Sequence, residues 1–304
     1  MNPILKQPSV SRQQSVELAA VSAFTLIELL VVICVIALLA ATLVPTLAGS
    51  RIGSQSLSCM NNNRQLTAAW RMYADDSNER LIYASTSSSV GLMSIDPTDP
   101  DNYAWTGAHM DFTGANRANW DPAYDMMKRL LWPYNKSVGI YKCPSDHSTV
   151  VWVGVSRPRI QSFSMNLYVG GFAPAKGGGP QGDDGGWPFA DPYRIFSKTT
   201  DLTAPGPAKT FIFTDMRPEA NHWGNFLTDM SGFPNNPAQY NLVDFPGVFH
   251  NLGACISFGD GHVEIHRWLD PRTAPPPPFT NSSSVASPNN VDIAWLQAHS
   301  TSPK

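Results

Sequence analysis

Side chains capable of chemistry gather near the C-terminal end of this sequence. His250 is followed after nine residues by Asp260, and the polar residues of the next segment recur at every second position. In an extended strand, His262, Glu264 and His266 would share one face and could present three ligands to a metal ion. Beside His250 and Asp260 they could also form an acid–base site. A turn cap and a solvated strand face account for the same pattern, and we expect this structural role.

The cysteines form a second group of reactive side chains: Cys34, Cys59, Cys143 and Cys255. No pair has C-x-x-C spacing, so a zinc ribbon has no support. Cys34 lies in an apolar run and is read as a small apolar residue. If the chain lies outside the cytoplasm, oxidation is allowed, and Cys59–Cys143 is the preferred disulfide because Cys59 lies on a helix face expected to meet the globular body. Cys255, inside an apolar strand, is expected to be simply buried, and spacing alone does not prove any pairing.

No familiar catalytic constellation is present in the sequence. It has no Gly-x-Ser-x-Gly, no glycine-rich phosphate loop before a helix and no His-Glu-x-x-His. We therefore predict that the chain is not an enzyme. Its 21 basic and 24 acidic residues give a net charge of −3 without a basic patch, which argues against nucleic-acid binding.

The longest apolar segment runs from Phe24 to Leu47, and Glu28 is its one side chain charged at neutral pH. As a helix this run would be roughly 36 Å long, enough to cross the hydrocarbon core of a bilayer. A carboxylate in such a segment is expensive and marks a functional site by default. The alternative is that Glu28 lies at the membrane interface and reaches water. The run is too long for an ordinary secretory signal peptide.

The hexamer Ala23-Phe24-Thr25-Leu26-Ile27-Glu28 resembles the processing and methylation site of type IV pilins and type II secretion pseudopilins. The resemblance implies that prepilin peptidase cuts between Ala23 and Phe24, and that Phe24 is then N-methylated. Pro45 lies where many pilins also carry a proline. Ala23 replaces the usual glycine, from which we expect slower processing at worst.

The same resemblance gives Glu28 a role in assembly. In a filament of parallel helices, Glu28 of one subunit could pair with the freed amine of Phe24 on its neighbour. A buried carboxylate is tolerable only when it is paired, so this contact would set the register between subunits. The implied partners are prepilin peptidase, other pilin-like subunits and the lipids of the inner membrane.

The sequence predicts an α+β, pilin-like fold: a long N-terminal helix, its first half transmembrane, packed on an antiparallel sheet with long loops. The expected parts are a leader (1–23), a transmembrane helix (24–48), an amphipathic continuation of that helix (49–78) and an extracytoplasmic domain (79–304). The continuation carries an apolar stripe with a seven-residue repeat, consisting of Ile52, Cys59, Leu66 and Tyr73. Further expected elements are strands at 160–169, 209–214, 254–258 and 262–268, and a final helix at 291–299.

A second resemblance lies near the C-terminus. Residues 250–261, with His250, Asp260 and Gly261 as the key positions, resemble the H-x9-D-G motif of prepilin-type processing-associated proteins with a DUF1559-like body. Weaker local similarity lies at 59–66, 143–146 and 163–166. Major pseudopilins bind calcium in a C-terminal acidic loop, and Asp292 lies in a comparable region. A ring of oxygen ligands is not evident, so no cofactor is predicted.

These observations lead to one main hypothesis. The chain is a pilin-like or pseudopilin-like structural subunit that is cleaved, methylated and assembled through its N-terminal helix. It would be a single-pass inner-membrane protein with its C-terminal domain periplasmic or extracellular. One alternative is a membrane-tethered binding module that never polymerises; another is a metal-dependent surface enzyme built around His250, Asp260 and His262.

Overall fold

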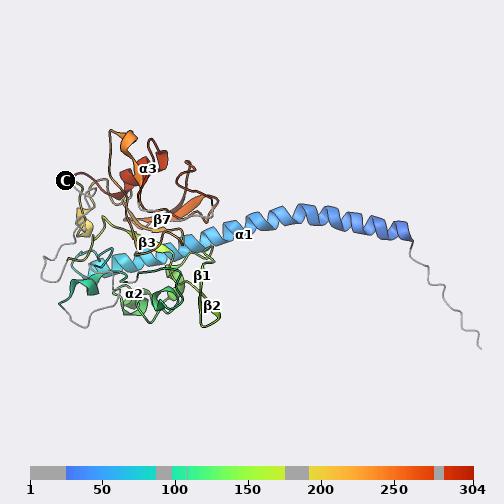
Figure 1. The fold of residues 1–304 in the computed structure, drawn as a ribbon, viewed down its shortest axis with the longest axis horizontal. Helices are drawn as coiled ribbons and strands as arrows, with labels where there is room; N and C mark the ends of the chain where they lie inside the picture. The colour runs from blue at the N-terminus through green and yellow to red at the C-terminus, as the bar shows by residue number, and fades with distance from the viewer. Residues whose placement is uncertain (1–24, 87–97, 108, 175–191, 277–283) are drawn as a thin grey trace, which may run out of the picture. The chain divides into compact units, whose positions relative to one another are not determined.

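The structure is a computed structural model that describes residues 25–86, 98–107, 109–174, 192–276 and 284–304, with backbone alone for 40–52 and 100. Ala23, Phe24 and the leader therefore lie outside the described residues, and the side chain of Pro45 is likewise not described. The chain divides into two compact units, Met1–Gly49 and Ser50–Lys304. Helix α1 (Leu26–Asp76) contributes to both (Figure 1).

In the first unit, every described side chain from Thr25 to Leu39 is exposed. No helix of the described residues is long and apolar enough to cross a membrane. The predicted transmembrane half of the helix (24–48) is therefore wrong as a description of this structure.

The second unit is built on a five-stranded sheet with the order β5-β3-β4-β7-β8. Its strands are β3 (Phe163–Asn166), β4 (Phe211–Asp215), β5 (Asn225–Phe226), β7 (Gly253–Phe258) and β8 (Val263–Arg267). Neighbouring strands are antiparallel except β3 and β5, which are parallel. The prediction of an antiparallel sheet is therefore wrong, because the sheet is mixed. The chain leaving β4 passes to the far edge of β3 and there runs in the same direction as β3.

Smaller elements surround this sheet. Two-stranded pairs are formed by β1 (Thr149–Trp152) with β2 (Val155–Pro158), and by β6 (Asn241–Leu242) with β9 (Val285–Ala286). The other α-helices are α2 (Trp132–Asn135) and α3 (Val291–Ser300). Short 3-10 helices lie at Pro100–Tyr103, Arg117–Asn119, Met126–Lys128, Val138–Tyr141, Thr199–Asp201 and Pro237–Gln239.

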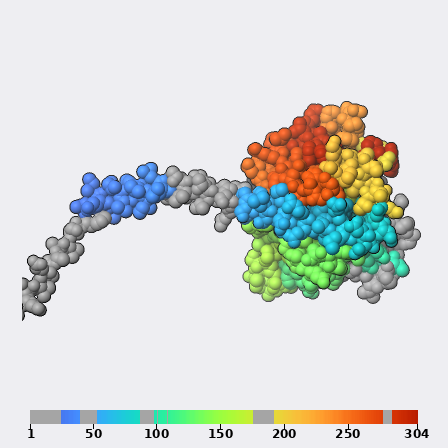
Figure 2. Space-filling view, turned by 180° about the vertical axis from the view of Figure 1, so that it is seen from behind, coloured from blue at the N-terminus to red at the C-terminus, as the bar shows by residue number. Residues whose placement is uncertain are grey.

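The central sheet is covered on both faces. One core cluster joins the α1 residues Cys59, Leu66 and Tyr73 to sheet residues such as Phe213 and Cys255. A second cluster lies on the face of the sheet that is turned away from α1, where β4 and β7 pack against α3. Its members include Phe211, Ala254, Ile256, Phe258, Ile293 and Leu296. Figure 1 shows α1 and α3 on opposite sides of β7, and Figure 2 shows α1 crossing the face of the body seen from behind. The predicted apolar stripe is confirmed at the three positions whose side chains are described.

Two predicted C-terminal elements are confirmed. Strands β7 and β8 form the expected hairpin, and Gly261 takes a φ of 95° in the turn between them, which a glycine adopts at little cost. Helix α3 begins after Asn290, whose side chain accepts hydrogen bonds from the backbone of Asp292 and Ile293. The strands expected at 160–169 and 209–214 correspond to the shorter β3 and β4.

Candidate metal centre

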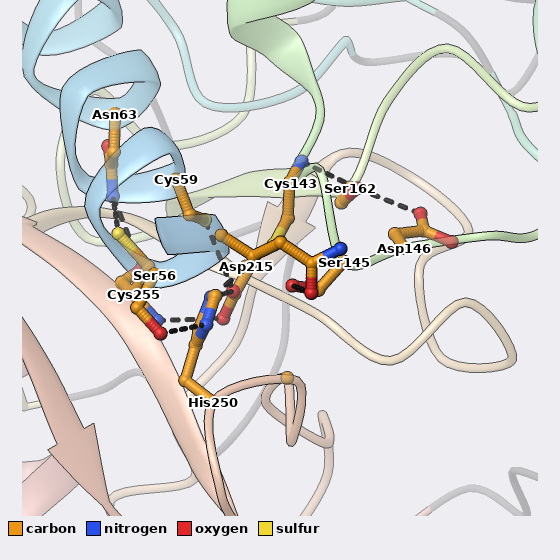
Figure 3. Close-up of polar contacts among 12 residues, drawn as sticks. Ser56, Cys59, Asn63, Cys143, Ser145, Asp146, Ser162, Asp215, His250 and Cys255 are labelled. Carbon is orange, nitrogen blue, oxygen red and sulfur yellow. Dashed lines mark hydrogen bonds and ion pairs between the residues drawn. The ribbon is translucent and has the colours of Figure 1, made fainter. Parts of the chain in front are cut away.

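Four segments far apart in the sequence bring metal-ligating side chains together in the second unit (Figure 3). We call these residues the thiol–histidine cluster: Cys59 on α1, Cys143 just after the 3-10 helix at 138–141, Asp215 at the end of β4 and His250 in the loop before β7. Each offers one ligand atom, and these atoms all lie within 4.8 Å of one another. All four residues are buried.

His250 stands at the centre of the cluster. Its Nε2 lies 3.3 Å from the Sγ of Cys143 and 3.3 Å from the Oδ2 of Asp215. The thiol of Cys59 donates to the same Oδ2 at 3.8 Å. A single imidazole nitrogen, one carboxylate oxygen and two sulfurs therefore face a common point.

Neighbouring groups hold the ligands in this orientation. The Oγ of Ser56, one turn before Cys59 on the same helix face, lies 3.0 Å from the Nδ1 of His250. The backbone N–H of Cys255 donates to the Oδ1 of Asp215 at 3.0 Å, which leaves Oδ2 directed at the cluster. Ser56 thus fixes the orientation of the His250 ring, and the N–H of Cys255 fixes that of the Asp215 carboxylate. Hydrogen bonds of this kind orient ligands for a metal ion.

The turn that carries Cys143 is tied to strand β3. The N–H of Cys143 donates to the Oγ of Ser162 at 3.1 Å, and Ser162 donates to the Oδ2 of Asp146 at 2.8 Å. The N–H of Asp146 closes the turn on the carbonyl of Cys143 at 3.0 Å. The ammonium of Lys142 lies 3.7 Å from the same carboxylate oxygen. Cys143 is thus positioned by a buried polar network and not only by its local sequence.

The loop before β7 is a tight turn. The N–H of His250 donates to the carbonyl of Gly253 at 3.2 Å, and Asn251 and Leu252 both have left-handed φ angles, of 55° and 61°. Gly247 packs directly on the end of β4: a Cβ added there would lie 2.4 Å from the Oδ1 of Asp215. A glycine is therefore required at this point for the carboxylate to keep its place.

The ionisable groups of the cluster shift one another's pKa values. Burial lowers the pKa of His250, but the hydrogen bonds and charges of Asp215 and Cys143 outweigh it and raise the pKa to about 10. Burial raises the pKa of Asp215 and of Cys59, whereas the hydrogen bond from Cys59, followed by that from His250, lowers the pKa of Cys143. The contacts of the imidazole with Asp215 and Cys143 therefore favour its protonated form.

The predicted Cys59–Cys143 disulfide is not formed in the structure, where both residues are free thiols. Their sulfur atoms nevertheless belong to the same cluster. Cys255 is also buried, as expected for an apolar strand, and its Sγ accepts from the Nδ2 of Asn63 at 3.6 Å.

The H-x9-D-G motif is divided between two places. Asp260 lies in the hairpin turn, where its Oδ1 accepts from the N–H of His262 at 3.1 Å and lies 2.6 Å from the Nδ1 of that residue. The ring of His266 stacks on Trp295 at 3.8 Å, and its Nδ1 lies 3.8 Å from the Oε1 of Glu264. Among the described residues, the three side chains of the β8 face do not form a metal-ligating group.

The remaining predicted positions have local roles in the structure. Both carboxylate oxygens of Asp292 accept backbone N–H groups of Leu269 and Asp270, at 2.9–3.1 Å, so they fasten a loop to α3. The Oε2 of Glu28 accepts from the N–H and hydroxyl of Thr25 at 2.9 and 2.7 Å, while the Oγ1 of Thr25 accepts from the N–H of Glu28 at 3.3 Å. This is a capping box at the start of α1.

Asp215 is the cluster member that the sequence analysis missed. It follows a buried strand, Phe211–Thr214, and a carboxylate at the end of such a strand needs a partner inside the protein. That was the available signal. The sequence analysis pairs Cys59 with Cys143 as a disulfide and places His250 in a different motif.

Comparison with known proteins adds no identification. The chain matches no family model, and no curated protein or solved structure is similar to it.

Proposed function

We propose that this chain is a pilin-like or pseudopilin-like structural subunit that assembles with similar subunits through the N-terminal part of α1. The observation that carries the proposal is the surface of that helix. Its large apolar side chains are exposed, for example 81 % for Leu26, 69 % for Ile27 and 70 % for Leu38. Contiguous exposed apolar side chains of this kind mark an interaction site, where another apolar surface covers them. Parallel copies of the same helix would supply that cover.

The first turn of α1 is consistent with a register contact between such copies. Glu28 is exposed there, and its carboxylate lies beside the backbone N–H of Thr25. After a cut between Ala23 and Phe24, the new terminal amine would lie next to Thr25 in the chain. A carboxylate and an amine at one end of parallel helices can pair between neighbouring subunits and fix their stagger.

The proposal includes a location. Before assembly the chain would be associated with the inner membrane, and its second unit would lie outside the cytoplasm. This placement rests on the resemblance of residues 23–28 to the pilin processing site, and no helix of the described residues is long and apolar enough to span a membrane.

The test combines the mature N-terminus with assembly. Mass spectrometry of the chain from its native cells should find a methylated Phe24, and cells without prepilin peptidase should retain the leader. Glu28→Ala should leave cleavage intact but abolish sedimentable or cross-linked oligomers, whereas Glu264→Ala, a half-buried carboxylate on β8, should not affect them. An uncut chain, or oligomers that persist in Glu28→Ala, would contradict the proposal. Persisting membrane attachment with no oligomers even in the wild type would favour the tethered binding module.

A further inference from the structure

We propose that the thiol–histidine cluster is a closed, structural binding site for a tetrahedral transition-metal ion of the zinc class. The inference concerns the second unit alone and does not depend on assembly of the N-terminal helix. Two thiolates, one imidazole nitrogen and one carboxylate oxygen are a donor set that suits zinc. None of the roles assigned above to these residues uses them together.

The distances between the donor atoms support tetrahedral coordination. With metal–sulfur bonds of about 2.3 Å and metal–nitrogen or metal–oxygen bonds of about 2.0–2.1 Å, neighbouring ligands lie about 3.3–3.8 Å apart. The three donor pairs involving His250, Asp215 and the sulfurs lie at 3.3, 3.3 and 3.8 Å. An ion can therefore enter with small adjustments of side chains that already converge.

The supporting contacts provide the second observation. Ser56 lies at the Nδ1 of His250, on the opposite side of the ring from the cluster, so Nε2 is free to act as the ligand. The N–H of Cys255 occupies Oδ1 of Asp215, which assigns Oδ2 to the ion. His250 and Asp215 therefore each have one polar atom committed to an outer partner and the other directed at the cluster.

Two other chemistries suit the cluster less well. A disulfide between Cys59 and Cys143 would use the sulfurs but give no role to the buried pair of Asp215 and His250. A cysteine nucleophile would need substrate access and a histidine that uses one ring nitrogen for the thiol and the other for the carboxylate. Here the same Nε2 faces both groups. Three pockets of the described part of the chain are lined by residues outside the cluster.

The position of the site indicates what the ion would do. It would connect α1, the turn at 143–146, the end of β4 and the loop before β7, which are otherwise joined only through packing and hydrogen bonds (Figure 3). Structural zinc sites have four protein ligands and no open position, and their binding free energy stabilises the fold. The ion would therefore cross-link α1 to the sheet and stabilise their contact.

The test uses the purified full chain under reducing conditions. Elemental analysis should find about one zinc per chain, and replacement by Co²⁺ should give thiolate-to-cobalt charge-transfer bands with tetrahedral visible bands. Cys143→Ser and Asp215→Asn should lower metal affinity by at least about tenfold, and Ser56→Ala by about tenfold. Cys34→Ser, which removes a thiol of α1 that lies outside the second unit, is the control and should keep the cobalt spectrum.

The wild-type result decides the question even if a ligand variant fails to fold, which circular dichroism would reveal. Stoichiometric zinc, or the cobalt spectrum, in the folded wild type supports the site. A folded, fully reduced wild type that takes up neither metal overturns it. A chain recovered with a Cys59–Cys143 disulfide that still binds no metal after reduction also overturns it, as does equal loss of binding in Cys34→Ser and Cys143→Ser.

Discussion

Removing a single hydroxyl, in Ser162→Ala, should destabilise the second unit far more than its size suggests. The Oγ of Ser162 is fully buried, accepts the N–H of Cys143 at 3.1 Å and donates to the carboxylate of Asp146 at 2.8 Å. Hydrogen bonds to a charged group contribute about 1.5–3 kcal/mol, and a buried N–H left without a partner costs about 1–3 kcal/mol. Because the two effects overlap, we expect a loss of about 3 kcal/mol in the free energy of unfolding.

The matched control is Ser145→Ala in the same turn. Its hydroxyl is half-buried and makes one contact, with the Oε1 of Gln55 at 3.3 Å, so we expect a loss of about 0.5 kcal/mol. Denaturant unfolding of the full chain and its two variants measures both values. A loss of about 3 kcal/mol lowers the midpoint of thermal unfolding by about 6–12 °C. Equal stability of the two variants would refute the claim that the buried network holds the Cys143 turn.

Three further changes test other parts of the second unit. Gly247→Ala places a Cβ 2.4 Å from the carboxylate of Asp215, so it should cost about 1–3 kcal/mol and lower the melting temperature; an unchanged value would contradict the close packing. Leu66→Ala empties a fully buried position between α1 and the sheet and should cost about 2–5 kcal/mol in denaturant unfolding. Burial raises the pKa of Asp244 to about 7, although the N–H of Leu227 opposes the shift, so the folded state holds this proton more tightly than the unfolded state. Stability should therefore be lost as pH rises from about 4 through about 7, by about 1–2 kcal/mol because the residue keeps some exposed surface. Asp244→Asn should lack this loss when unfolding is compared at pH 5 and pH 8.

Elements with strong local signals could be predicted from the sequence. The β7–β8 hairpin has alternating apolar residues on either side of an Asp-Gly turn, and α3 follows an asparagine cap. The mixed sheet could not be predicted, because β5 has only two residues and carries no periodicity. Its parallel pairing with β3 depends on the path of the whole chain.

The candidate metal centre, like the fold, could be predicted only in part: single residues could be named from the sequence, but their meeting in the folded chain could not. Cys59, Cys143 and His250 were each recognisable as reactive, but nothing in their spacing places them together. Asp215 looks like the end of an ordinary buried strand. The cluster exists because the sheet register fixes β4 beside β7 while α1 packs across both. Sequence reasoning could name candidate ligands, whereas their convergence is a property of tertiary packing.

The nine-residue spacing between His250 and Asp260 has a geometric explanation in the way β7 lies along α1. Contacts join the two elements in the same order along both: Ser56 with His250, Asn63 with Cys255, Thr67 with Ser257 and Arg71 with Asp260. The helix rises about 22 Å over the fifteen steps from Ser56 to Arg71. The five steps from Gly253 to Phe258 in β7 span about 17 Å, and a short turn at each end supplies the rest. The nine-residue spacing therefore matches the length of one strand with its turns to about four turns of helix α1. His250 lies in the cluster at one end of β7, and the carbonyl of Asp260 accepts a hydrogen bond from the Arg71 side chain at the other.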